Sequence, residues 1–299
     1  MALPPHDQRR ARQNAPVARP LRTIAGGLAF AEGPRWHGDR LWFSDMGTKA
    51  VVAVDADGGA PEHVVTVPGR PSGLGWLPDG RLLVVSMADR SVLRLERGEL
   101  AVHADLADLV SHDCNDMVVD ARGNAYVGNA GFDLTARPLQ VSPAQVVLVR
   151  ADGQAAVVDD QVLFPNGSVV ADDGGTLVVA ETFGNRLTAF DIAGDGTLSG
   201  RRTWAELPGR SPDGTCLDAE GAIWVADASS TSCVRVREGG EVLDEVDVGP
   251  LHAFACALGG PAGTTLFVCA AEGFTGAAMK RRTAAVVALE VEVPGAGSP

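Results

Sequence analysis

The chain has 299 residues, of which 36 are glycine and 18 proline, and it carries a formal net charge of −13. This negative charge argues against a nucleic-acid partner, because phosphate binding needs an excess of Lys and Arg on one face. Five cysteines without paired ligand spacing indicate neither a disulfide framework nor a cysteine-bound zinc site, and no stretch is apolar enough to span a membrane.

The N-terminal residues 1–20 contain several Pro and Arg and few apolar anchors, a composition typical of a disordered extension. Residues 21–292 are expected to form one domain, and residues 293–299 a C-terminal tail. The N-terminus lacks the apolar region of a secretory leader, so we expect a protein of the reducing cytoplasm.

Six segments of the domain repeat one plan: a polar opening position, a short apolar run, a turn built on Gly and Asp, and a second apolar run. The second runs recur at intervals of roughly 40 to 50 residues, the period of a four-stranded propeller blade. They cover residues 41–45, 82–86, 125–129, 177–181, 223–227 and 266–270. The sequence therefore predicts an all-β fold, a six-bladed β-propeller.

Short apolar runs at the two ends of the domain predict how the ring closes. Residues 21–24 are expected to form a strand that completes the last blade, whose own final run covers residues 284–291. Closure of this kind removes the open sheet edges that would favour aggregation.

Four of the opening positions carry oxygen ligands: Glu32, Asn115, Asn166 and Asp213. The first strand of each blade lines the central channel, so equivalent opening residues meet at one channel mouth. Carboxylate and amide oxygens together suit Ca²⁺, Mg²⁺ or Mn²⁺. Each residue could be an ordinary turn residue instead, but Glu is a poor turn residue and all four share one register.

Three further residues are candidates for contact with a substrate. His252 lies at the opening of the sixth repeat, although a lone His is more often packed or hydrogen-bonded. Asn129 ends the second run of the third repeat, and Asp133 lies in the long segment after it, a candidate wall or lid. At the equivalent ends of other second runs, Asp45 and Asp227 are expected to bond neighbouring loops.

Four segments resemble the senescence marker protein/gluconolactonase family, which includes the regucalcin-like lactonases. They read Ala-Glu-Gly-Pro-Arg-Trp (31–36), Asn-Asp-Met-Val-Val-Asp (115–120), Phe-Pro-Asn-Gly (164–167) and Pro-Asp-Gly (212–214). The resemblance implies a six-bladed propeller with one divalent metal at the channel mouth, with Ca²⁺ as the first expectation and Zn²⁺, Mn²⁺ or Mg²⁺ as alternatives. By resemblance, Glu32, Asn166 and Asp213 match the metal ligands, Asp213 also matches the general base, and Asn115 matches a substrate contact.

One position departs from the family pattern. Members that act on sugar lactones carry an Arg two residues before the third-blade Asn, and this chain has Asp113 there. This difference argues against a polyhydroxylated aldonolactone as the substrate. The phenylalanines near these segments favour a less polar one: Phe132, Phe164, Phe183 and Phe254.

The expected function is metal-dependent opening of a small-molecule lactone, with the metal as Lewis acid and Asp213 as general base. The same site could instead hydrolyse a phosphotriester or another ester. A propeller that binds a ligand without catalysis is a third alternative, because fold does not fix function. The sequence contains no motif for a serine nucleophile, a phosphate or a dinucleotide.

Overall fold

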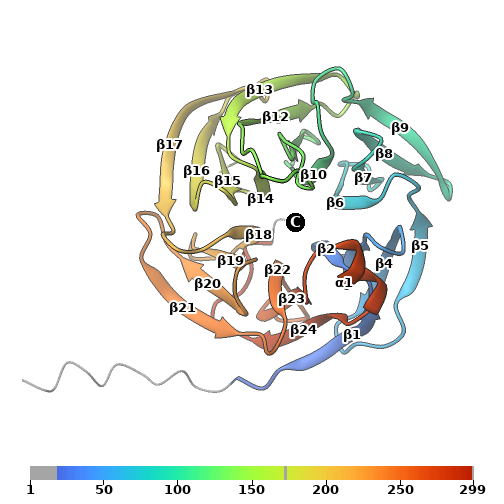
Figure 1. Cartoon of the computed structure of the whole chain (residues 1–299), viewed down its shortest axis with the longest axis vertical. Helices are drawn as coiled ribbons and strands as arrows, with labels where there is room; N and C mark the ends of the chain where they lie inside the picture. The colour runs from blue at the N-terminus through green and yellow to red at the C-terminus, as the bar shows by residue number, and fades with distance from the viewer. Residues whose placement is uncertain (1–18, 172–173, 298–299) are drawn as a thin grey trace, which may run out of the picture.

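The computed structural model describes residues 19–171 and 174–297. It consists of six four-stranded sheets arranged radially around a channel (Figure 1), which confirms the predicted six-bladed β-propeller. In each sheet the first strand of the repeat is innermost.

Five sheets are built from four consecutive strands each. Blade 1 comprises β2 (Ala31–His37), β3 (Arg40–Asp45), β4 (Ala50–Asp55) and β5 (Glu62–Thr66). Blade 2 comprises β6 (Pro71–Trp76), β7 (Leu82–Ser86), β8 (Ser91–Glu96) and β9 (Glu99–Asp105). Blade 3 comprises β10 (Cys114–Val119), β11 (Ala125–Asn129), β12 (Ala144–Val149) and β13 (Ala155–Val162).

The remaining blades follow the same order, except that the last one uses both ends of the domain. Blade 4 comprises β14 (Pro165–Val170), β15 (Thr176–Glu181), β16 (Arg186–Ile192) and β17 (Leu198–Glu206). Blade 5 comprises β18 (Pro212–Leu217), β19 (Ile223–Asp227), β20 (Ser232–Val236) and β21 (Val242–Asp247). Blade 6 comprises β22 (His252–Gly259), β23 (Thr265–Ala271), β24 (Ala284–Glu290) and β1 (Arg22–Leu28).

The N-terminal strand closes the ring. β1 pairs antiparallel with β24, with Thr23 opposite Val287. This pairing confirms the predicted closure and leaves no open edge between the first and last blades. Just before β1, Arg19 forms an ion pair with Asp244 at 2.7 Å. Residues 1–18 of the predicted extension lie outside the described residues.

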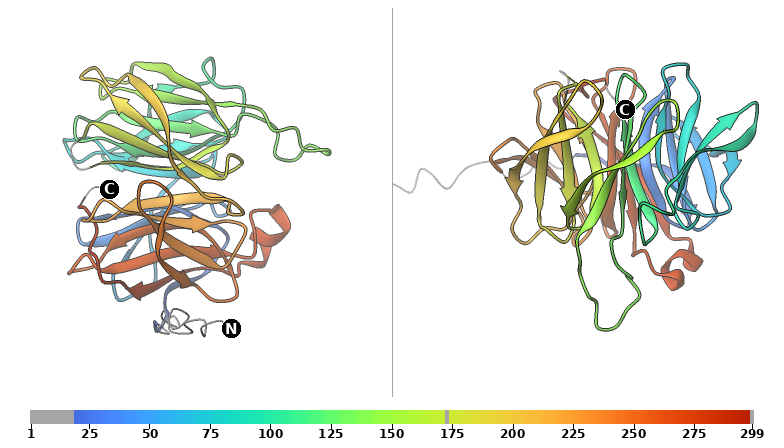
Figure 2. Two further views of the ribbon diagram at one scale, coloured as in Figure 1. Left: turned by 90° about the vertical axis from the view of Figure 1, so that its left-hand side faces the viewer. Right: turned by 90° about the horizontal axis from the view of Figure 1, so that it is seen from above.

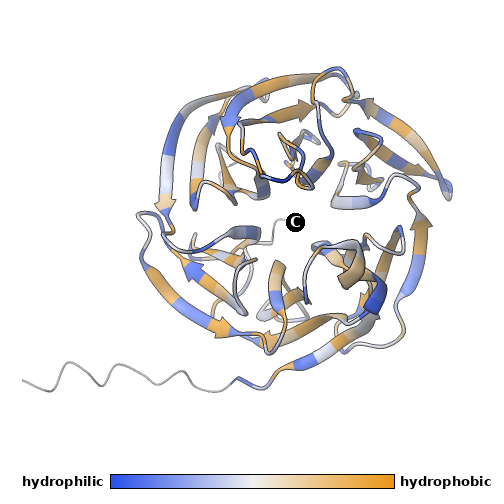
Figure 3. Ribbon diagram, in the orientation of Figure 1, coloured by the Kyte–Doolittle hydropathy of each residue, from blue (hydrophilic) through white to orange (hydrophobic). Residues whose placement is uncertain are grey.

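Apolar side chains fill the spaces between blades, because each sheet packs both of its faces against its neighbours. All five residues of β7 are buried, as are all five of β11 and β19. Figure 3 shows the apolar colour along these inner strands and the polar colour on outermost strands such as β17, where most residues are exposed. Continuous burial explains why the second runs are apolar throughout rather than alternating.

Two long connections project from the same face of the ring (Figure 2). One joins β11 to β12 (residues 130–143), and the other joins β23 to β24 and contains the helix α1 (Gly276–Arg281). Across residues 19–171 and 174–297, no helix is long and apolar enough to cross a membrane.

The described part of the C-terminal tail lies against blades 5 and 6. Ala219 N donates to Pro294 O at 2.8 Å, and Ala296 N donates to Leu217 O at 3.1 Å. These bonds hold the tail where the innermost strand β18 ends. Residues 298–299 lie outside the described part of the chain.

Candidate active site

Every innermost strand departs from regular pairing close to its first residues. In β18, for example, the register shifts between Pro212 and Thr215. In five strands the shift spans the opening residue, and in β2 it begins directly after Glu32; the five spanned residues are Ser72, Asn115, Asn166, Asp213 and Phe254. Such a bulge re-aims side chains out of the ladder. The opening residues therefore share one structural position, at the start of each innermost strand.

Glycine after the opening residue lets neighbouring innermost strands approach closely. A Cβ added to Gly167 would lie 2.4 Å from Thr215 N and 2.6 Å from Asp213 O, closer than any real side chain allows. Similar close approaches to the next blade occur at Gly33, Gly73 and Gly214. Glycine in this register therefore brings Asn166 and Asp213 together from adjacent blades.

The two carboxylates of this ring are buried and electrostatically strained. Burial raises the pKa of Glu32 well above its ordinary value, and the nearby carboxylates of Asp213 and Asp116 raise it further. Burial and the Asp116 carboxylate likewise raise the pKa of Asp213. Asp213 Oδ1 is buried and has no hydrogen-bond partner. Buried charge of this kind needs a compensating cation or a proton.

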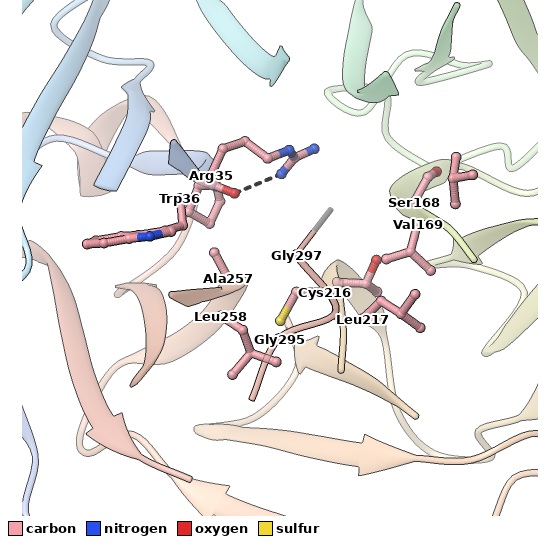
Figure 4. Close-up of a pocket in the computed structure, with 13 residues that line it drawn as sticks. Arg35, Trp36, Ser168, Val169, Cys216, Leu217, Ala257, Leu258, Gly295 and Gly297 are labelled. Carbon is pink, nitrogen blue, oxygen red and sulfur yellow. Dashed lines mark hydrogen bonds between the residues drawn. The ribbon is translucent and has the colours of Figure 1, made fainter. Parts of the chain in front are cut away.

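An ion pair lies next to the ring, across the channel from blade 1 to blade 3. Arg35 Nη2 lies 3.2 Å from Asp116 Oδ1 and donates to Met117 O at 2.6 Å. Nη1 of the same guanidinium donates to Pro34 O at 2.9 Å, the dashed line in Figure 4. Both charged side chains are buried. The guanidinium therefore pairs with Asp116 and also opposes the rise in the pKa of Glu32, whereas Asp213 faces the Asp116 carboxylate.

Sequence reasoning did not identify this ion pair. Asp116 stands in the register where β6, β14 and β18 carry Gly, and Arg35 is a charged residue between Pro34 and Trp36 in β2. These two irregularities in the repeat were the available signals. They do not reveal that the two side chains meet across the channel.

The donor set of the ring fits a hard divalent cation. The amide nitrogen of Asn166 donates to Thr182 Oγ1 at 3.2 Å, which leaves the amide oxygen for a ligand. Glu32 Oε2 accepts only the short local bond from Gly33 N at 3.0 Å among the described residues. No group of three or more His, Cys, Asp or Glu within the described ranges could hold a metal. A cation here would therefore depend on the Asn166 amide as well as on the two carboxylates.

Two predicted substrate contacts, Asn115 and His252, lie at or beside the ring. Ser72 Oγ lies 3.5 Å from Asn115 Oδ1, so the Asn115 amide nitrogen remains available as a donor. His252 Nδ1 lies 3.0 Å from the carbonyl oxygen of Ala228, which can only accept. Nδ1 therefore carries the proton, and Nε2 is the nitrogen left to accept one.

The other two predicted contacts, Asn129 and Asp133, have partners in or next to the loop 130–143. Asn129 is fully buried, its Oδ1 accepts from Gly131 N at 3.0 Å, and its Nδ2 donates to Gln145 O at 2.8 Å. Asp133 is exposed and accepts from Thr135 N at 2.7 Å. These bonds give both side chains local structural roles, and their contact with a substrate stays a prediction.

Carboxylates at the ends of second strands hold the backbone just before three opening residues. The bonds are Phe30 N to Asp45 at 2.9 Å, Leu163 N to Glu181 at 2.7 Å and Ser211 N to Asp227 at 3.0 Å. They confirm the loop-bonding roles predicted for Asp45 and Asp227. The three blades concerned are those that carry Glu32, Asn166 and Asp213.

Arg70 and Asp113 form an ion pair. They lie two residues before the opening positions of blade 2 and blade 3, respectively. Both side chains are about half-exposed. The acidic residue that departs from the family pattern therefore has a basic partner from the adjacent blade. The pair gives this part of the mouth a polar surface.

A separate cavity of about 80 Å³ lies farther along the innermost strands. Because these strands all begin at the ring of opening residues, their later residues lie toward the opposite mouth. Residues lining the cavity include Trp36, Val169, Thr215, Cys216, Leu258 and Gly295 (Figure 4). Among the described residues no carboxylate side chain lines it, and its charged lining residue is Arg35, the partner of Asp116.

The chain is similar to known proteins over nearly its whole length. The family model described as SMP-30/Gluconolactonase/LRE-like region matches residues 30–272. The pentonolactonase of Haloferax volcanii is 27% identical over 259 residues, 84% of this chain and 85% of that protein. The diisopropyl-fluorophosphatase of Loligo vulgaris is 30% identical over 129 residues, 40% of this chain and 41% of that protein.

The six-bladed propeller of this chain is also similar to solved structures. A calcium-binding protein, regucalcin, from Agrobacterium tumefaciens str. C58 matches with a TM-score of 0.77 and 22% identity, covering 92% of this chain and 96% of that chain. At this identity the likeness bears on the fold alone.

Proposed function

Because this chain belongs to the SMP-30/gluconolactonase/LRE-like family, we propose that it is a hydrolase that opens a lactone and depends on a divalent cation. The observation that carries the proposal is the buried Asp213 carboxylate, whose Oδ1 has no hydrogen-bond partner and whose pKa is raised by burial and by neighbouring carboxylates. Buried charge persists in proteins when it is paired or binds a metal.

Glu32, Asn166 and Asp213 would hold the cation. Their hard oxygen donors favour Ca²⁺, with Mn²⁺, Mg²⁺ and Zn²⁺ as alternatives. When bound, such a cation supplies a Lewis acid for the ester carbonyl. The free negative charge of the ring, with three carboxylates against the Arg35 guanidinium, supports binding of a divalent ion.

The side chains around the cation would move the proton and orient the substrate. Asp213 Oδ1 accepts a proton from water as the water oxygen bonds to the carbonyl carbon. The ring C–O bond then breaks, and the proton passes to the leaving alkoxide, so the product is a hydroxy acid. The Asn115 amide nitrogen donates to a substrate oxygen, and His252 offers Nε2 as a further contact.

We expect a simple lactone rather than a sugar lactone. The name of the Haloferax volcanii relative indicates a pentonolactone as the substrate of that protein. In the present chain the Asp113 carboxylate stands at the mouth in place of a guanidinium, and it engages the Arg70 guanidinium of the adjacent blade. We also expect the protein to act in the cytoplasm, since all five cysteines are unpaired.

The test is hydrolysis of simple γ- and δ-lactones before and after removal of metal by a chelator. Activity should be lost with the chelator and return with Ca²⁺ or one of the alternative ions. Asp213→Asn should lower kcat by about 100-fold or more, because it removes the base and weakens the cation site. Full metal-dependent activity in Asp213→Asn would contradict the assignment.

Thr215→Val is the matched control on the same strand. Thr215 Oγ1 is buried without a partner and Thr215 lines the separate cavity, so its loss should change neither activity nor folding.

A second candidate, phosphotriester hydrolysis, is favoured by the likeness to diisopropyl-fluorophosphatase over 129 residues. Turnover of a fluorophosphate but of no lactone would select it. Metal binding without turnover of either class would indicate a binding propeller.

A further inference from the structure

Three phenylalanine side chains from separate segments form a cluster beside the ring of opening residues. Phe132 comes from the loop 130–143, Phe164 directly precedes β14, and Phe183 lies between β15 and β16. Their ring centroids lie 5.3, 5.5 and 6.0 Å apart, in T-shaped or tilted pairs. Aromatic pairs are stable in this geometry, so the three rings form one apolar surface. We call it the phenylalanine cluster.

The phenylalanine cluster is connected directly to the proposed ligand residues. Phe164 precedes Asn166 by two residues, a span of about 7 Å at most along the chain. Phe183 follows Thr182, whose Oγ1 accepts from the Asn166 amide and donates to Pro212 O at 2.8 Å. A molecule bound at Asn166 therefore lies within reach of the cluster.

Two features of the cluster are energetically costly and point to a functional surface. The side chain of Phe183 is exposed, with 37% of its residue surface accessible. Phe164 has φ of +60°, a left-handed conformation that bulky residues rarely adopt and that is concentrated at functional sites. Thr182 N donates to Phe164 O at 3.2 Å and Glu181 accepts from Leu163 N, so bonds on both sides hold this conformation.

The third ring is placed by a buried amide. Asn129 Oδ1 binds Gly131 N, and Phe132 is the next residue, packed and buried. Asn129 therefore acts as a positioning residue for the cluster. On the other side of Asn115 the mouth is polar, because the Arg70 and Asp113 pair lies there. An apolar wall beside a few polar donors is the usual composition of a small-molecule site.

We propose that the phenylalanine cluster binds a hydrocarbon substituent of the substrate, so that the protein acts on lactones with an alkyl or aryl substituent. This inference rests on the proposed lactone hydrolysis and names its substrate class. The substituent packs against the exposed face of Phe183 while the ester lies at Asn166 and Asp213.

The experiment compares kcat/KM for γ-butyrolactone, which has no substituent, with that for γ-nonalactone, which carries an alkyl chain. The substituted lactone should be preferred by about tenfold or more, the discrimination typical of a hydrophobic pocket. Phe183→Ala should reduce this ratio by about tenfold, and Phe183→Leu, which keeps an apolar side chain, should reduce it less.

Leu243→Ala is the matched control. Leu243 has nearly the same exposure, 38%, but lies on the outermost strand β21, so its loss should leave both rates unchanged. An unaltered ratio in Phe183→Ala, or a wild-type preference for the unsubstituted lactone, would overturn the inference.

Calorimetric titration separates failure of this inference from failure of the proposed hydrolysis. In the presence of Ca²⁺, γ-nonalactone should bind the wild-type protein more tightly than it binds Phe183→Ala, whether or not it is hydrolysed. Equal affinities would overturn the subsite even if both lactones are turned over. Tighter binding without turnover would support the subsite and contradict the proposed reaction.

Discussion

The two ends of the channel are built from the same six innermost strands, yet they carry different chemistry. Where the strands begin, Glu32 and Asp213 are buried beside the Asn166 amide. Farther along, the cavity of about 80 Å³ is lined mainly by apolar side chains such as Val169 and Leu258. The bulges explain the difference, because they release side chains at the strand starts, whereas the residues that follow return to regular pairing.

The largest effect is expected from the ion pair between the two ends. Arg35→Met should lower the free energy of unfolding by about 3–5 kcal/mol, because it leaves the buried Asp116 carboxylate unpaired near Glu32 and Asp213. Urea denaturation measures the loss. Adding Asp116→Asn should recover most of it, since the unpaired charge is then gone. A small loss in the single variant would contradict the prediction, because it would show that the Asp116 carboxylate does not depend on Arg35.

A smaller effect is expected from a brace at the end that carries the opening residues. Burial alone would raise the pKa of Glu181, but hydrogen bonds from Arg186, Thr188 and Leu163 N outweigh burial and lower it. A lowered pKa means that the bonds stabilise the fold fully above the ordinary value of 4.5 and lose their effect as the pH falls through the folded pKa.

Glu181→Gln should therefore lower the free energy of unfolding at pH 7 by about 1–3 kcal/mol, and the difference from wild type should shrink below the ordinary pKa. Denaturation curves between neutral and acidic pH measure both. Glu241→Gln, which removes an exposed pair with Arg237, serves as the control and should have little effect at any pH. A difference that grows on acidification would contradict the lowered pKa.

The smallest effect is expected at the opposite end. A Cβ on Gly295 would lie 2.9 Å from Leu258 Cβ, so Gly295→Ala should displace the tail at a cost of under about 1 kcal/mol. Cys216, the cysteine that is not fully buried, lines this cavity and should then react faster with a thiol reagent. Lactone hydrolysis should not change. Reduced hydrolysis would show that the tail influences the ring of opening residues.

Much of this arrangement could be predicted, because the repeat fixes the register of each blade. The triplet Pro-Asp-Gly occurs twice, and register alone separates its two uses. Asp79 accepts from Arg81 N at 3.2 Å within a hairpin turn, whereas Asp213 lies at the start of the innermost strand β18. The same three residues therefore occupy different positions of the repeat, one in a turn and one in an innermost strand.

Partners between blades could not be predicted in the same way. The repeat places Arg35 and Asp116 in two strands but does not say that the long guanidinium side chain spans the channel. For Asn129, the repeat gives its position at a strand end but not its two backbone partners, Gly131 and Gln145. Side-chain direction and loop path decide these contacts, and neither has a period in the sequence.

The pairing of β1 with β24 has a consequence for how the protein is made. Blade 6 contains both the first and the last strand of the domain, so the ring stays open during synthesis until residue 290 has left the ribosome. By then Glu32, Asn166 and Asp213 have all been translated, but the fourth strand of blade 6 has not yet paired with the third. Contacts between such distant parts of a chain form slowly. The ring that carries the proposed cation site is therefore closed late in folding.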